Sequence, residues 1–155
     1  MELGIPELRE RMKLMAEKSY DQVKSLLLHE VIGDIIDLQL DKSGISLFEI
    51  KEEHVFSRTQ IARGHHIFAQ ANSLAIAVIN DEIALTASAE IRFLRSVKMN
   101  EKCIAKAYIR GVSGERNKAK VEVVTFVGEE MVFQGHFTVY RSAKDPGGDS
   151  SEDSN

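Results

Sequence analysis

Hydrophobic and polar positions repeat with two different periods along this chain of 155 residues. Apolar side chains recur every three or four residues from Ile5 onward, which predicts an amphipathic helix over about residues 5–18 with Pro6 in its first turn. Residues 20–33 fit either a second short helix or a turn region that leads into a strand. From Asp34 the period changes to two, which is typical of strands. We therefore expect a helical N-terminal segment followed by a sheet.

Six short segments predict strands, and the last four alternate clearly enough to be half-exposed members of an antiparallel sheet. The first two flank a turn signal at residues 41–44, and the last four are joined by connections that are short enough for hairpins. The simplest topology pairs consecutive strands of the last four in a meander. The predicted strands cover residues 35–40, 45–50, 84–93, 102–110, 118–127 and 131–140.

Residues 64–79 form a run of sixteen positions without Asp, Glu, Lys or Arg. The run is too short for a membrane span of about 20 apolar residues, and His, Gln and Asn interrupt it, so it predicts a buried helix. Small side chains at Ala69, Ala71, Ala75 and Ala77 would let strands or a partner's helix approach closely. Only the neighbouring strands can cover such a helix. We therefore expect an α+β hot-dog fold, an antiparallel sheet wrapped around a central helix, preceded by the amphipathic helix and paired into a homodimer.

Composition and charge narrow the class of protein further. Hydrophobic residues make up 43% of the chain, and ten Gly and two Pro are too few for a low-complexity chain, so one folded domain is expected. The single cysteine, Cys103, allows no intrachain disulfide, and the N-terminus does not resemble a signal peptide, so a cytoplasmic location is expected. The last eleven residues contain four acids and no base, which leaves 20 acids and 20 bases in residues 1–144. Such a neutral body is not expected to bind nucleic acid strongly by itself.

Arg63 stands directly before Gly64, at the expected start of the central helix. Unpaired backbone N–H groups, the helix dipole and a guanidinium together favour an anion there, and a glycine lets a ligand approach the backbone. The alternative is a solvated arginine beside a helix-start glycine. Phe56, upstream, would either cap such a pocket or belong to the core. An anion site at this helix start is the main chemical hypothesis.

Four other residues allow a functional and a structural interpretation. His65 and His66 are adjacent, so on a helix they point in different directions, and ordinary polar or packing roles explain them better than a metal site or a general base. Asn72 would either hydrogen-bond to a neighbouring strand or donate to a ligand carbonyl. Cys103 alternates with small residues on one strand face, which favours a buried, unreactive thiol. These patterns predict neither a catalytic residue nor a metal ligand.

Three segments resemble closely the FapR family, repressors of fatty-acid and phospholipid biosynthesis in Gram-positive bacteria. They are IPELRERMKLMAEK, HVFSRTQIARGHHIFAQANSLAIAVI and LTASAEIRFLRSVK, and the resemblance extends from Ile5 to Ser142. It implies a helix-turn-helix domain joined through a linker helix to an effector domain that binds malonyl-CoA or malonyl-acyl-carrier protein and then releases operator DNA. Residues 1–19 are then the linker helix to a missing DNA-binding domain, residues 20–144 the hot-dog effector-binding domain, and residues 145–155 a disordered acidic tail.

The resemblance also implies a site. Arg63 would pair with the malonyl carboxylate, while Phe56, Gly64, Asn72 and Leu85 would line the pocket for malonyl-pantetheine. Malonyl-CoA would be a regulatory ligand and no cofactor would be needed. The implied partners are a second copy of the chain and operator DNA, the latter bound through the missing domain, and no membrane.

The central helix is also similar, more distantly, to that of hot-dog acyl-CoA thioesterases, in which an HGG-type stretch precedes a catalytic carboxylate. Here the corresponding residues are Arg63, Gly64 and His65, and Asn72 stands where the acid is expected. Because an amide cannot act as a nucleophile or a general base, this difference favours binding without hydrolysis. A thioesterase remains the alternative function.

Overall fold

The computed structural model describes residues 10, 11, 13, 14, 21–112 and 117–142. Glu10, Arg11, Lys13 and Leu14 are helical, and the rest of the helix predicted for residues 5–18 lies outside the described residues. The predicted acidic tail lies outside them as well.

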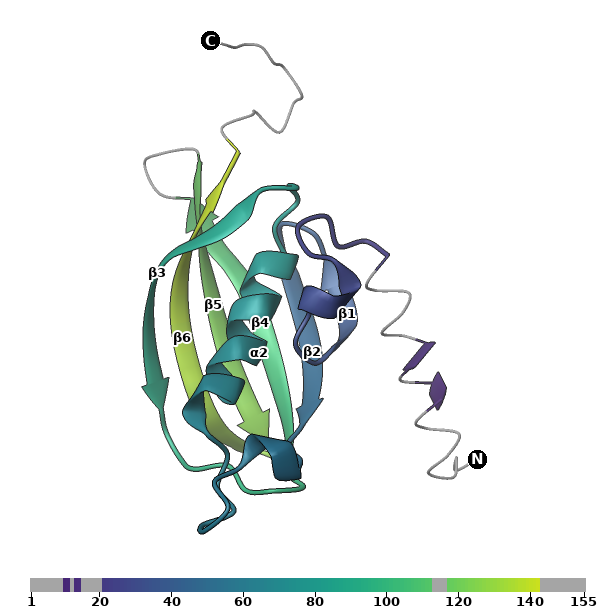
Figure 1. Ribbon diagram of the computed structural model, residues 1–155. Coiled ribbons are helices and arrows are strands. Elements are labelled where there is room, and N and C mark those ends of the chain that lie inside the picture. The colour runs from purple at the N-terminus through teal and green to yellow at the C-terminus, as the bar shows by residue number, and fades with distance from the viewer. Residues whose placement is uncertain (1–9, 12, 15–20, 113–116, 143–155) are drawn as a thin grey trace.

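Among the described residues, six strands form one antiparallel sheet in the order β1-β2-β4-β5-β6-β3 (Figure 1). All six segments were predicted as strands, the last four from two-residue alternation, and in β5 and β6 the inward side chains are buried at alternate positions. The strands are β1 (Asp34–Gln39), β2 (Ser43–Glu49), β3 (Ala84–Phe93), β4 (Lys102–Val112), β5 (Lys118–Val127) and β6 (Glu130–Arg141).

The helix α2 (Gly64–Ala77) lies against the concave face of this sheet (Figure 1). Ala71, Ala75 and Ala77 are completely buried, as their small size predicts for positions of close approach. The predicted buried helix is confirmed, with an end two residues earlier than expected, and the α+β hot-dog fold is confirmed with it. Among the described residues, no helix combines the length and the apolar character that crossing a membrane requires.

Residues 21–33 contain turns and the short 3-10 helix η1 (Leu28–Glu30), so the turn alternative describes this segment better than a regular second helix. The backbone N–H of Ile32 donates to Ser73 Oγ, and the hydroxyl of Ser25 donates to the carbonyl oxygen of Ile76. Both bonds join the segment to α2. The helix is therefore covered partly by this segment and not by strands alone.

The expected meander is wrong at one connection. β3 pairs with β6 instead of β4, while the hairpins β4–β5 and β5–β6 are confirmed. Two strands separate β3 from β4 in the sheet, which corresponds to about 14 Å at a spacing of about 4.8 Å per strand. The eight residues 94–101 can span about 26 Å when extended, so they can cross the end of the sheet. A short connection therefore permitted a hairpin but did not require one.

Gly135 generates a prediction about the packing of the core. It lies on β6 between Phe133 and Phe137, and an added Cβ would be 2.6 Å from Cε1 of the buried Phe137 ring. We expect Gly135→Ala to lower the free energy of unfolding by about 1–3 kcal/mol, because the buried ring or the strand has to shift to make room for the added methyl group. Urea unfolding measures this change. The control is Ser88→Ala at an exposed position of β3, and equal stability of the two variants would contradict the prediction.

Candidate functional site

Two loops lie at the start of α2, and we call them the entry loops: residues 50–62 lead into the helix, and residues 94–101 connect β3 to β4. The first contains the 3-10 helix η2 (Glu52–His54) and folds back on itself, with Val55 bridged to Ala62. The second joins it through a hydrogen bond of 2.7 Å from the backbone N–H of Ala62 to the carbonyl oxygen of Val97. The two entry loops are therefore hydrogen-bonded to each other next to the start of α2.

Arg63 is the N-cap of α2, and its guanidinium turns back onto the first entry loop. Nη1 donates to the carbonyl oxygen of Val55 and Nη2 donates to that of Glu53, each at 2.6 Å. Nη2 also lies 3.3 Å from Nε2 of His66. The side chain is half-buried and hydrogen-bonded to the first entry loop. The anion-site hypothesis stays a prediction.

Three histidines surround this arginine. The ring centroids of His54 and His66 are 4.8 Å apart, and those of His65 and His66 are 4.1 Å apart. Burial lowers the pKa of His66, and the charges of His65, His54 and Arg63 lower it further, against the opposing effect of Glu53. Among the described residues, no group of three or more His, Cys, Asp or Glu side chains is arranged to hold a metal ion.

A cavity of about 310 Å³ opens beside the first turn of α2. Gly64 forms part of its wall, and a Cβ at that position would be 3.3 Å from Cζ of Phe93, so the glycine allows the ring to lie against the helix start. The walls are mainly apolar, and Arg95 and Ser96 add polar groups. Phe56 is not part of this cavity and is largely exposed. Apart from Gly64, the residues that line the cavity are Ile61, Ala62, Ile67, Phe93, Leu94, Arg95, Ser96, Val97 and Val132.

Asn72 lies eight residues beyond Gly64, which corresponds to about 12 Å along the helix axis. Its Oδ1 accepts a hydrogen bond from the hydroxyl of Thr86 on β3, so the expected bond to a neighbouring strand is confirmed. No partner of its Nδ2 occurs among the described residues, and a role toward a ligand stays a prediction.

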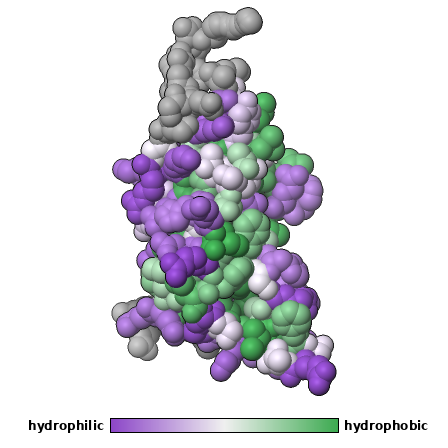
Figure 2. Space-filling view, turned by 90° about the vertical axis from the view of Figure 1, so that its left-hand side faces the viewer, coloured by the Kyte–Doolittle hydropathy of each residue, from purple (hydrophilic) through white to green (hydrophobic). Residues whose placement is uncertain are grey.

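Leu85 precedes Thr86 on β3 and therefore points to the opposite face of the sheet. Its register partner is Tyr140, and it is 61% exposed. Within one chain, the consecutive residues Arg63 and Gly64 lie at the start of α2, Asn72 lies farther along the helix, and Leu85 points away from it. Figure 2 views the molecule from the side on which β3 lies in Figure 1, and it shows hydrophobic side chains between more hydrophilic regions.

The contacts of Arg63 with His66 and of Gly64 with Phe93 were not predicted. Arg63 and His66 are three residues apart at a helix start, a spacing that brings side chains together, so the sequence did contain a signal for this pair. Phe93 offered no such signal, because its position depends on the place of β3 in the sheet.

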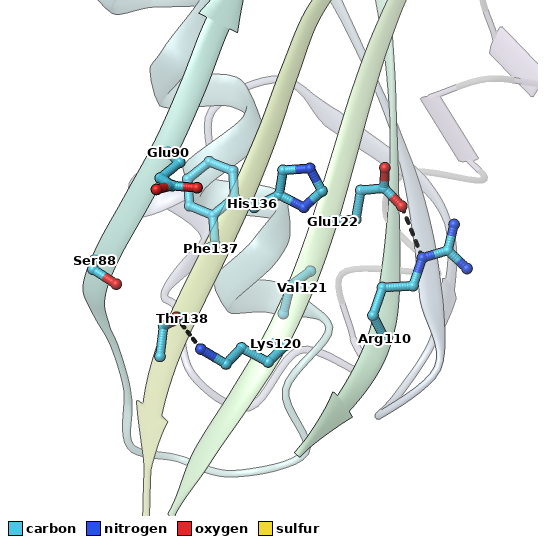
Figure 3. A pocket seen from close by; sticks show the side chains of 9 residues that line it. All are labelled: Ser88, Glu90, Arg110, Lys120, Val121, Glu122, His136, Phe137 and Thr138. Carbon is cyan, nitrogen blue, oxygen red and sulfur yellow. Dashed lines mark hydrogen bonds and ion pairs between the residues drawn. The ribbon is translucent and has the colours of Figure 1, made fainter. Parts of the chain in front are cut away.

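A second hollow, of about 390 Å³, lies on the sheet face that is turned away from α2 (Figure 3). Arg110 Nε donates to Glu122 Oε1 at 2.8 Å, and Lys120 Nζ donates to Thr138 Oγ1 at 3.0 Å. The Arg110 guanidinium also lowers the pKa of Glu122. None of the predicted site residues lies here. We therefore interpret this hollow as a solvent-exposed strand surface whose charged side chains, Arg110 and Glu122, pair with each other.

The fold and the helix start define the class of protein. It is a hot-dog domain whose central helix is preceded by an arginine at the N-cap and carries no carboxylate between Gly64 and Ala77. No known protein-family profile matches the chain. A curated relative, transcription factor FapR of Bacillus subtilis strain 168, is 64% identical over 143 residues, which are 92% of this chain and 76% of the relative. The chain belongs to the FapR family of transcription factors.

Solved structures share the fold. An uncharacterized protein from Pyrococcus horikoshii aligns with a TM-score of 0.71 and 27% identity over 79% of this chain and 93% of its own. A Streptococcus mutans protein bound to acetyl-CoA aligns with a TM-score of 0.64 and 18% identity over 70% of this chain and 87% of its own. The second likeness concerns the fold alone.

Cys103 generates a prediction about reactivity. The thiol is completely buried, and burial, together with the charge of Glu101, raises its pKa to about 12. The thiol therefore stays protonated, and we expect no reaction of the native protein with a thiol reagent such as DTNB at pH 8. The same protein in denaturant should react with one equivalent. Rapid labelling of the native state would contradict the prediction.

Proposed function

We propose that this chain is the effector-binding part of a repressor of fatty-acid and phospholipid biosynthesis genes. Its ligand is malonyl-CoA or malonyl-acyl-carrier protein, and binding of the ligand releases the repressor from operator DNA. The observation that supports this function best is the half-buried guanidinium of Arg63 at the N-terminal end of α2.

The chemistry of this helix start suits a carboxylate. Arg63 carries five N–H donors, and the described residues accept three of them through Val55, Glu53 and His66. The positive end of the helix dipole adds to the attraction for an anion. A malonyl thioester supplies a carboxylate that an acetyl thioester lacks. The same fold holds acetyl-CoA in the Streptococcus mutans protein, which supports a CoA thioester as the ligand class.

The remaining residues of the proposed pocket are Phe56, Gly64, Asn72 and Leu85. Leu85 points away from α2 in its own chain, so a pocket that includes it has to continue around the edge of β3. A second copy of the chain at that edge would enclose the pocket. A homodimer therefore belongs to the same proposed function.

β3 has the properties of an edge that pairs with another copy. It has one neighbour in the sheet, β6, so its outer backbone groups are available. Large apolar side chains are exposed within it or next to it, with Ile83 at 53%, Phe93 at 53% and Leu94 at 43%. These side chains lie at the two ends of β3, so a second copy of the chain that pairs with this edge would cover apolar surface at both ends of the strand.

Binding without hydrolysis is the preferred function, because α2 offers no acid to activate water or attack a thioester. Asn72, at the position expected for that acid, is hydrogen-bonded to Thr86. Contact with operator DNA would need a helix-turn-helix domain, which the described residues do not contain. Release of free CoA on incubation with malonyl-CoA would favour the thioesterase alternative.

We expect Arg63→Ala to weaken binding of malonyl-CoA by at least about tenfold, which corresponds to about 1.4 kcal/mol, with little effect on acetyl-CoA. Isothermal titration calorimetry with both ligands measures the difference. Arg58→Ala is the matched control, because Arg58 is an exposed arginine in the same entry loop. Equal malonyl-CoA affinity of the wild type and Arg63→Ala would remove Arg63 from the site.

We expect light scattering at micromolar concentration to give the mass of two chains. Ile83→Asp should shift the equilibrium toward the monomer, because it places a charge in the apolar edge. Leu27→Asp changes an exposed leucine next to η1 and serves as the control. A wild-type protein with the mass of one chain would contradict the proposed homodimer.

A further inference from the structure

At the start of α2, Arg63 is in contact with His66, whose imidazole can gain or lose a proton. Nη2 of Arg63 lies 3.3 Å from Nε2 of His66. A guanidinium N–H can only donate, so Nε2 of His66 has to be the unprotonated acceptor and the imidazole has to be neutral.

The orientation of the guanidinium depends on three acceptors. Two are carbonyl oxygens of the first entry loop, from Val55 and Glu53, and they cannot change their protonation. The third is His66. Within the described part of the chain, the Nε–H and one N–H of Nη1 have no acceptor, so these donors remain for a ligand.

We infer that His66 is a positioning residue, which holds the Arg63 guanidinium in the orientation that binds the carboxylate of a malonyl thioester. The inference rests on the proposed function of Arg63. His66 need not contact the ligand. It acts through the hydrogen bond that its neutral imidazole accepts from Nη2.

The surroundings of His66 set the pH range in which this bond exists. His54 and Glu53 face it from η2, and His65 and Arg63 face it from the helix start. Burial and three of these four groups lower the pKa of His66 below its usual value of 6.5, so the acceptor is present at neutral pH. Protonation under acidic conditions removes the acceptor and adds a positive charge beside the guanidinium. Affinity for malonyl-CoA should therefore fall as the pH falls.

Two substitutions separate the hydrogen bond from the charge. His66→Gln keeps an acceptor that does not titrate, whereas His66→Leu removes the acceptor at every pH. At pH 7.5 we expect His66→Gln to bind malonyl-CoA within about twofold of the wild type and His66→Leu to bind about five- to tenfold more weakly. Acetyl-CoA lacks the carboxylate, so both variants should bind it like the wild type.

The pH profile is the second measurement. As the pH is lowered from 7.5 to well below 6.5, calorimetry should show a loss of malonyl-CoA affinity in the wild type and a flat profile in His66→Gln, because the pKa of His66 lies below 6.5. His136→Gln is the matched control, because His136 is exposed on the outer sheet face, and it should keep the wild-type profile. If His66→Leu does not fold, as judged by circular dichroism, the comparison of wild type with His66→Gln decides the question.

The outcomes distinguish this inference from the proposed function. Tight binding by His66→Leu, or a wild-type pH profile in His66→Gln, would overturn the role of His66 while Arg63→Ala still reports on the malonyl site. A parallel loss of acetyl-CoA affinity in His66→Leu would also overturn it, because the histidine would then support the loop in general. A wild type that binds no malonyl-CoA at pH 7.5 would reject the proposed function and the inference together.

Discussion

Burial of α2 is the constraint on which the rest of the structure depends. A helix without a charged side chain cannot face water along most of its surface, so both the curved sheet and residues 21–33 have to cover it. Gln70 is a polar exception in this core, and its Nε2 donates to the carbonyl oxygen of Cys103 and to Ser46, which ties the helix to β4 and β2. The position of the helix relative to the sheet is therefore fixed by packing and by specific hydrogen bonds.

Charged and polar side chains gather at the N-terminal end of the buried helix α2. The first N–H groups of an α-helix have no partner within the helix, and at this end of α2 the chain gathers a guanidinium and three imidazoles. Arg63 connects the helix to the first entry loop, and hydrogen bonds connect that loop to the second, which leads into β4. A ligand that changes the contacts of Arg63 would act on the ends of several elements at once.

The local elements could be predicted from the sequence because alternation and the absence of charge report burial directly. Which elements pack next to each other could not be predicted in this way. The place of β3 depends on which surfaces remain free after β4, β5 and β6 have formed their hairpins, and periodicity does not contain that information. The position of Phe93 beside Gly64 was missed for this reason. The pair of Arg63 and His66 is different, because its spacing on the helix was available in the sequence.

The pairing of β3 with β6 has a consequence for biosynthesis. Phe93 pairs with Phe133, forty positions later in the chain, so β3 cannot acquire its neighbour until most of the protein has left the ribosome. At about 5–20 residues per second, synthesis of the intervening segment takes about 2–8 s. During that interval α2 and β3 are made but β6 is not, and the apolar helix remains incompletely covered. Nascent chains of this fold therefore present a hydrophobic segment to the cell for seconds before the native sheet can close over it.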